Sequence, residues 1–139
     1  MRILRKRVVS SDGSLVGRVK DLVLLDNEHP IYIVAGGRRK YYALLPQDIK
    51  SVGEMIVADN IYKVNIESQF EKALFIFSRS AKSEVVGKSG HSLGYLRGLE
   101  LDDERHYPKI ILKNKIGEMT IPCSMISGER DNKIVINSE

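Results

Sequence analysis

The chain has no tryptophan, four prolines and a single cysteine, Cys123. One cysteine excludes an internal disulfide and is typical of a protein that works in the reducing cytoplasm. Long apolar runs are also missing, since the longest, such as residues 73–77, reach five residues. A transmembrane helix needs about 20 apolar residues, so no transmembrane segment is predicted. The basic N-terminus also lacks the apolar region of a secretory signal peptide.

Broad positive charge is missing as well, although the net charge of the 139-residue chain is +4. Four basic residues lie at the start of the chain, and the other 18 basic residues balance the 18 acidic ones. These four are Arg2, Arg5, Lys6 and Arg7. A chain that is neutral beyond its first seven residues does not predict the broad basic face that phosphate binding favours.

The sequence contains an internal repeat. Residues 12–17, DGSLVG, return as SGHSLG at 89–94, which is 77 positions later. A repeated unit of this kind predicts two copies of one supersecondary structure. At the same offset three further positions match: Leu22 with Leu99, Asp26 with Asp103, and His29 with His106.

Strand patterns dominate both copies. Short runs of β-branched and apolar residues alternate with turns rich in glycine, proline and aspartate, and five strands in about 50 residues favour a small bent β-barrel. Gly17 within a strand predicts a bulge or bend. The predicted strands cover 7–9, 15–25, 31–34, 41–45 and 55–57 in the first copy, and 84–86, 93–101, 109–112, 118–121 and 133–136 in the second.

The sequence therefore predicts an all-β protein with two small barrels in tandem, 1–60 and 83–139, joined by a connector at 61–82. A half of about 57 residues is marginal alone, so the two halves are expected to pack on each other or on a partner.

The connector contains a helical pattern. A capping box begins at Ser68, and apolar residues recur at i, i+3, i+4 and i+7 from Phe70, which favours an amphipathic helix over 69–79. A strand over 74–77 remains the alternative, since short apolar runs fit both periods. Two glutamates and a lysine on the polar side favour a packed connector over a membrane-surface helix.

The outward positions of the second strand differ between the copies. Val23 and Leu25 are apolar, whereas the aligned Glu100 and Asp102 are charged. A strand that is apolar on both faces predicts a cover, which could be the connector, the other repeat, a second subunit in a homodimer or an external partner. The candidate residues of a protein interface are Val23, Leu25, Tyr32, Tyr41 and Tyr42.

No residue cluster predicts catalysis, a cofactor or a metal site. His29 and His106 occupy matching turns near carboxylates, but repetition alone explains them. Cys123 follows Pro122 with no histidine or asparagine partner in its pattern. The loop at 36–40 is either a solvated hairpin tip or a phosphate contact. The candidate basic contacts for RNA are Arg2, Arg5, Lys6, Arg7, Arg38, Arg39 and Lys40.

One family resemblance covers both copies. The run Val-Val-x-x-Asp-Gly-x-x-Val-Gly-x-Val-x-Asp-Leu at 8–22 resembles the opening of PRC-barrel domains. The close of each copy is similar too, with Leu45-Pro46 leading to Ile56-Val57 and Ile121-Pro122 leading to 134–136. The second copy departs from the pattern, with Ser89 in place of the turn aspartate.

The resemblance implies a non-enzymatic protein. PRC-barrel domains occur in the H subunit of photosynthetic reaction centres, in the RimM ribosome-maturation factor, and as stand-alone archaeal proteins implicated in FtsZ-based cell division near the membrane-anchoring protein SepF. The tandem arrangement resembles the stand-alone class. We therefore expect a cytoplasmic protein–protein adaptor in prokaryotic, archaeal-type cell division, recruited to the division site by a membrane-anchored partner. The alternative is a ribosome or RNA assembly factor.

Overall fold

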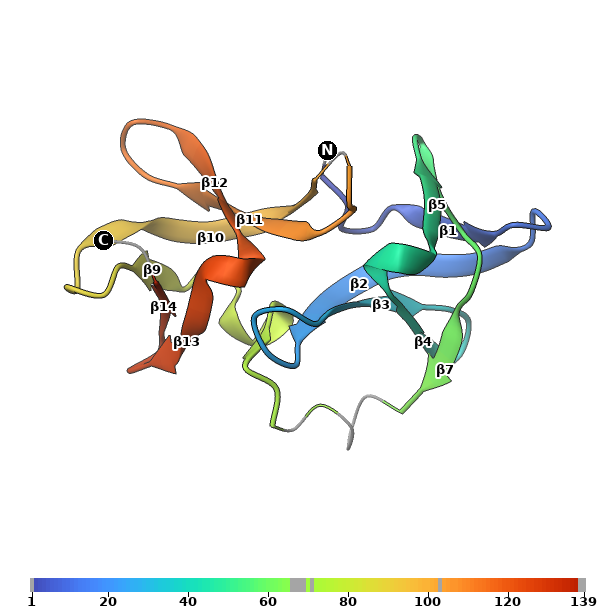
Figure 1. Ribbon diagram of the computed structural model, residues 1–139, viewed down its shortest axis with the longest axis horizontal. Coiled ribbons are helices and arrows are strands. Elements are labelled where there is room, and N and C mark those ends of the chain that lie inside the picture. Colours follow the sequence, from blue (N-terminus) through green and yellow to red (C-terminus); the bar gives the residue numbers. More distant parts are fainter. Residues whose placement is uncertain (1, 66–69, 71, 103, 138–139) are drawn as a thin grey trace.

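Two mostly antiparallel sheets lie side by side along the long axis of the molecule (Figure 1). The computed structural model describes residues 2–65, 70, 72–102 and 104–137. The fold class is all-β, as the sequence predicts, and the described helical segments are single 3-10 turns.

The first sheet has the strand order β5-β6-β1-β2-β3-β4-β7, with β8 paired to β2. All pairs are antiparallel except β1 with β6, and a 3-10 turn, η1 (Pro46–Asp48), precedes β5. The strands of the first sheet are β1 (Arg7–Ser10), β2 (Leu15–Leu24), β3 (Pro30–Ala35), β4 (Tyr41–Leu44), β5 (Ile49–Val52), β6 (Met55–Ala58), β7 (Tyr62–Val64) and β8 (Phe75–Ile76).

The second sheet repeats this order as β13-β14-β9-β10-β11-β12. Only β9 and β14 pair in parallel, and η3 (Cys123–Met125) occupies the place of η1. The strands are β9 (Glu84–Val86), β10 (Ser92–Leu101), β11 (Pro108–Lys113), β12 (Glu118–Pro122), β13 (Ile126–Arg130) and β14 (Lys133–Ile136). The sequence repeat is therefore a repeat of topology, and the two sheets form two barrel-like units.

A glycine at the same place in each repeat lets two strands approach closely. The register between β1 and β2 shifts beside Gly17, which confirms the predicted bulge. A Cβ added at Gly17 would lie 2.1 Å from the carbonyl oxygen of Ala35. At Gly94 it would lie 2.8 Å from the carbonyl oxygen of Lys113. Only glycine allows the long central strand to bend this close to its neighbour.

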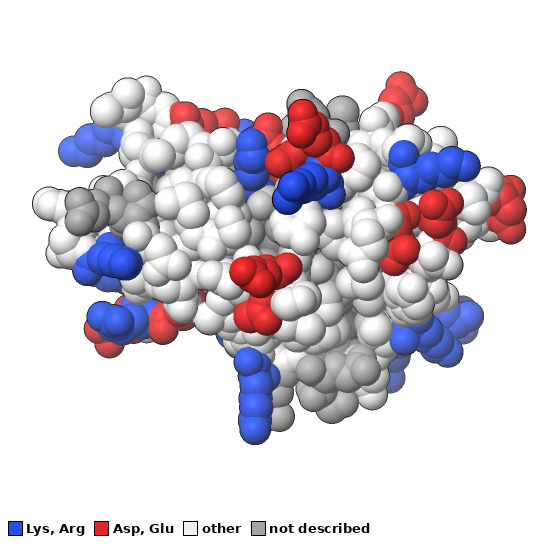
Figure 2. Space-filling model, viewed as in Figure 1, with Lys and Arg blue, Asp and Glu red and all other residues white. Residues whose placement is uncertain are grey.

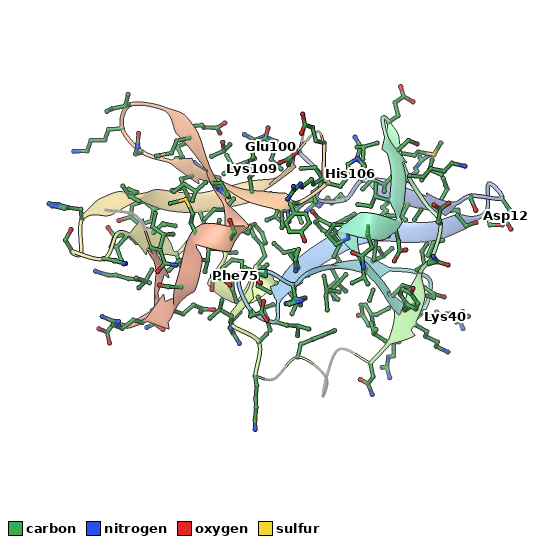
Figure 3. The ribbon with its side chains drawn as sticks, in the orientation of Figure 1. Asp12, Lys40, Phe75, Glu100, His106 and Lys109 are labelled. Carbon is green, nitrogen blue, oxygen red and sulfur yellow. The ribbon has the colours of Figure 1, made fainter. Side chains whose placement is uncertain are left out.

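The two repeats share one hydrophobic core. The N-terminal segment of the first repeat contributes to it by contacting the second repeat. Ile3 is fully buried, and its N–H donates to the carbonyl of Leu99 at 3.2 Å. Tyr32 of the first repeat is also buried, and its hydroxyl donates to the carbonyl of His106 at 2.5 Å. Figure 3 places Glu100, His106 and Lys109 near the middle of the molecule, where the sheets meet. The repeats therefore pack against each other, as their small size requires.

The described part of the connector contains no α-helix, so the predicted amphipathic helix over 69–79 is wrong there. Phe75 and Ile76 form β8, which pairs antiparallel with β2, and the 3-10 turn η2 (Ser78–Ser80) follows. The strand alternative is confirmed at these two residues, because pairing with β2 outweighs the local helical period. Residues 66–69 and 71, which include Ser68, lie outside the described residues.

Every predicted strand has a counterpart. In the described part of the chain, three further strands were not predicted, namely β5, β7 and β13. β7 lies within the range predicted as the connector, yet it extends the first sheet by pairing with β4. The domain bounds at 60 and 83 stay a prediction.

Candidate interaction surfaces

The outer face of β2 is covered from within the chain. Val23 is 2% exposed and packs in a small second cluster with Ile33 and Phe70, against which the partly buried Ile76 also rests. An internal cover is one of the predicted alternatives. A charged residue at position 23 would therefore disrupt the fold. Of the two candidate interface residues Val23 and Leu25, only Leu25, which follows β2 and is 46% exposed, remains available to a partner.

Asp21 fastens the connector to the first repeat. Its buried carboxylate accepts hydrogen bonds from the N–H of Ser78 at 2.9 Å, from the Ser78 hydroxyl, and from the N–H of Leu22 at 2.8 Å. The N–H of Phe77 donates to the Leu22 carbonyl nearby. The aligned residue in the second repeat is Gly98, so this attachment belongs to the first repeat alone.

The three candidate tyrosines do not form one exposed face. Tyr32 is buried at the junction of the repeats, and burial raises the pKa of its phenol. Tyr41 and Tyr42 are adjacent and partly buried on β4. The ammonium of Lys20 lies 4.6 Å from the centre of the Tyr41 ring and donates to its hydroxyl at 3.2 Å. Of these rings, Tyr41 and Tyr42 retain some access to solvent.

The candidate basic residues are dispersed. Arg2 reaches the second repeat, where its guanidinium forms an ion pair with Glu118 at 2.7 Å. Arg5 and Arg7 are exposed near β1, and Lys6 is partly buried. The tip residues 38–40 are exposed between β3 and β4, and Lys40 lies at the far end of the molecule from β12 (Figures 1 and 3). The seven residues therefore do not converge on one site.

Figure 2 shows acidic and basic side chains interspersed over the visible face. This mixture agrees with the balanced composition and shows no single-sign field on that side. No helix of the described residues is long and apolar enough to cross a membrane.

The titratable groups at the junction do not form a catalytic arrangement. A cavity of about 170 Å³ there is lined by residues from both repeats, including Asp102, Arg105 and Cys123. Burial raises the pKa of the Cys123 thiol, which keeps it protonated and unreactive. Within the described ranges, no group of three or more histidine, cysteine, aspartate and glutamate side chains could hold a metal ion.

The matched histidines have different surroundings. His29 Nδ1 lies 2.8 Å from a carboxylate oxygen of Asp26 on the surface. The backbone N–H of Glu28 and the His29 ring lower the pKa of Asp26. His106 instead adopts a left-handed backbone with φ 60° and offers its carbonyl to Tyr32. The repeat has therefore kept the residue type without keeping a common site.

The strands of the two repeats differ most clearly at one sheet edge. In the first repeat, β7 pairs antiparallel along β4, with Tyr42 opposite Lys63. β12 occupies the equivalent place in the second repeat, and in the described part of the chain it pairs with β11 alone. The open edge of β12 could not be predicted from the sequence. It is recognised only by comparison with the edge that β7 covers, and β7 was not predicted.

The hairpin geometry shows which backbone groups of β12 face outward. The N–H of Asn114 bonds to the carbonyl of Gly117 at 2.9 Å, and hydrogen-bonded pairs alternate along an antiparallel ladder. The backbone groups of Glu118 and Thr120 therefore point away from β11. Pro122 falls in the same phase, where its missing N–H costs no ladder bond.

Comparison with known proteins assigns the first repeat to a protein family. The family model described as PRC-barrel domain matches residues 2–65. These residues belong to the PRC-barrel family. The match ends just after β7, so β7 is part of this PRC-barrel domain.

Similarity to individual proteins is weak. No curated protein matches the chain. One similar solved structure is assigned as the 16S ribosomal RNA processing protein RimM of Pseudomonas aeruginosa. It is 12% identical, with a TM-score of 0.38, and the alignment covers 86% of this chain and 77% of that one. A likeness this low carries no argument about function.

Proposed function

We propose that this PRC-barrel protein is a non-enzymatic adaptor that binds a protein partner by adding a partner strand to the edge of β12. The proposal rests on a comparison between the two repeats. β7 lies along β4 in the first repeat, and the equivalent edge in the second repeat has no such strand among the described residues. The first repeat thus provides a template for a strand bound to the second.

The chemistry of β12 suits strand addition. The outward N–H and C=O groups of Glu118 and Thr120 can bond to an extended chain, which gives affinity without requiring a particular sequence. Met119 is 39% exposed and Thr120 is exposed, so side chains at the edge can add selectivity. By analogy with β7, the incoming strand runs antiparallel to β12.

The family resemblance suggests the process. Stand-alone PRC-barrel proteins are implicated in archaeal cell division, and we propose SepF, FtsZ or another PRC-barrel protein as the partner, with recruitment to the division site from the cytoplasm. A second copy of this chain could also provide the strand, which would make a homodimer. The second repeat is here taken to be a PRC-type barrel as well, with a domain division near 60 and 83.

The test compares Thr120→Pro with Thr120→Val in a pull-down from native lysate and in binding to purified SepF and FtsZ. Proline removes one outward N–H from β12 and no bond to β11, whereas valine keeps the donor at nearly the same shape. We expect partners captured by the wild type to persist with Thr120→Val and to be lost with Thr120→Pro. Equal capture by both variants would exclude the edge of β12 as the binding site.

The competing function is a ribosome or RNA assembly factor that uses the basic residues of the first repeat. Their dispersion weakens it, as does the pairing of Arg2 with Glu118. Nuclease treatment of the same lysate separates the two functions. Capture of ribosomal proteins that disappears with nuclease, and also with Arg38→Gln and Arg39→Gln in the first repeat, would favour the RNA function over the adaptor.

A further inference from the structure

The second repeat contains a cationic groove beside the β11–β12 hairpin. The groove has a volume of about 500 Å³ and is formed by β10, the start of the β11–β12 turn and the segment before β9. Its lining contains four cationic residues and no carboxylate. The lining residues are Lys82, Tyr95, Leu96, Arg97, Lys113, Asn114 and Lys115.

The positive charge of this groove is only partly offset, since Glu118 lies opposite Lys113 in the pairing of β11 with β12. Among the described residues, none of the four cations forms an ion pair. Two carboxylates lie opposite groove residues on neighbouring strands, Glu84 opposite Tyr95 and Glu118 opposite Lys113. Each forms an ion pair with a cation outside the groove, Glu84 with Lys133 and Glu118 with Arg2. Hydrogen bonding to Arg2 is the largest cause of the lowered pKa of Glu118, and the charges of Lys113 and Arg97 contribute less.

An exposed aromatic ring completes the groove. Tyr95 is 53% exposed and lies opposite Lys113 in the pairing of β10 with β11. The backbone of the adjacent turn is fixed, because the Asn114 amide donates to the carbonyl of Leu93 and its oxygen accepts from the N–H groups of Ile116 and Gly117. Cationic side chains can bind the phosphates of a phosphodiester chain, and an exposed aromatic ring beside them can stack on its bases. The hydrogen-bonded turn holds these side chains in place.

In the first repeat, cationic side chains on the equivalent strand form hydrogen bonds within the molecule. Arg5 and Lys82 hold aligned positions with the same left-handed backbone, φ 71° and 68°. In the first repeat Arg18 donates to the carbonyl of Arg5 at 3.1 Å, and Lys20 donates to Tyr41. The residues aligned with Arg18 and Lys20 are Tyr95 and Arg97, and both line the groove.

We infer that this groove binds single-stranded nucleic acid, with Arg97, Lys113 and Lys115 contacting phosphates and Tyr95 stacking on a base. The site lies outside the basic residues that the sequence singles out, and it is independent of strand addition at β12. Both sites use the β11–β12 hairpin, so one adaptor could hold a protein and a nucleic acid side by side.

The test measures the anisotropy of a labelled oligouridine of about 12 nucleotides, within the range of known single-strand site sizes, with the full chain over a salt series. Affinity should fall with salt, with a slope of log K against log salt of about −0.7 for each phosphate contact. Arg97→Gln with Lys113→Gln should reduce that slope by about 1.4. Tyr95→Ala should weaken binding about fivefold or more, whereas Tyr95→Phe should not.

The matched control is Arg38→Gln with Arg39→Gln, which removes the same charge from the equivalent hairpin tip of the first repeat. Its affinity should stay close to that of the wild type. An equal loss in the control, or no binding by the wild type at near-physiological salt, would overturn the inference.

A membrane surface is the competing ligand, because Ile116 at the hairpin tip is 98% exposed. Vesicles of equal parts phosphatidylglycerol and phosphatidylcholine test it. Groove-dependent binding to these vesicles without binding to the oligouridine would also overturn the inference. Thr120→Pro should bind the oligouridine normally, so failure of strand addition and failure of this site are distinguishable.

Discussion

The two repeats share a strand order but differ in what covers them. In the first, β8 and Phe70 cover the outer face of β2, and β7 covers the edge of β4. In the second, the residues aligned with Val23 and Leu25 are Glu100 and Asp102, and β12 pairs only with β11 among the described residues. Duplication of a fold therefore has not duplicated its surfaces. The first repeat uses its surfaces to complete the molecule, whereas among the described residues the edge of β12 in the second repeat is unpaired.

The largest effect is expected at the covered face. Val23→Glu places a charge in the apolar cluster with Ile33 and Phe70, which should lower the free energy of unfolding by at least about 3 kcal/mol. Leu25→Glu, two residues away and exposed, should change it by only about 0.5 kcal/mol or less. Urea unfolding followed by circular dichroism measures both. Equal stability of the two variants would show that the connector does not bury this face.

A smaller effect is expected where the connector is attached. Asp21→Asn preserves the shape of the side chain but removes a charged acceptor from Ser78, which should cost about 1–3 kcal/mol. Amide hydrogen exchange should accelerate at Phe77 and Ser78 more than in β10 or β11. Unchanged exchange at these two amides would contradict the proposed attachment.

The smallest effect concerns the ion pair that links the repeats. The Arg2 guanidinium holds the pKa of Glu118 below its ordinary value of 4.5. Because the folded-state pKa is lowered, this contribution to stability is present above the unfolded pKa and is lost as the pH falls through the folded one. In Arg2→Gln, a carbon-13 NMR titration should show the pKa of Glu118 returning toward the ordinary value. An unchanged titration would mean that other charges hold it.

The strands that could be predicted from the sequence are those whose pattern is local. β2 and β10 have apolar residues that recur along their whole length, and the Asp-Gly turn and Gly17 mark how the first strands bend. β5 is short and has exposed residues at its centre, so it looks like a loop until β6 pairs with it. β8 shows a helical period locally, and only its partner β2, some 50 residues away, decides its structure.

The candidate sites were less predictable for the same reason. Val23 correctly indicated a covered face, since an apolar residue on an outward position needs a cover. The groove, in contrast, brings together Lys82, Arg97 and Lys113 from three separate segments, and no spacing in the sequence links them. The open edge of β12 is visible only beside the closed edge of β4, which requires the strand order.

The crossing of Ile3 to Leu99 has a consequence for synthesis. A ribosome that has released the whole first repeat has not yet released β10, so the buried place of Ile3 does not exist at that stage. Domains generally fold as they emerge, but this one must keep its first residues uncovered until more than half of the chain has been made. Burial of Ile3 is therefore a late step that follows synthesis of the second repeat and does not accompany the first.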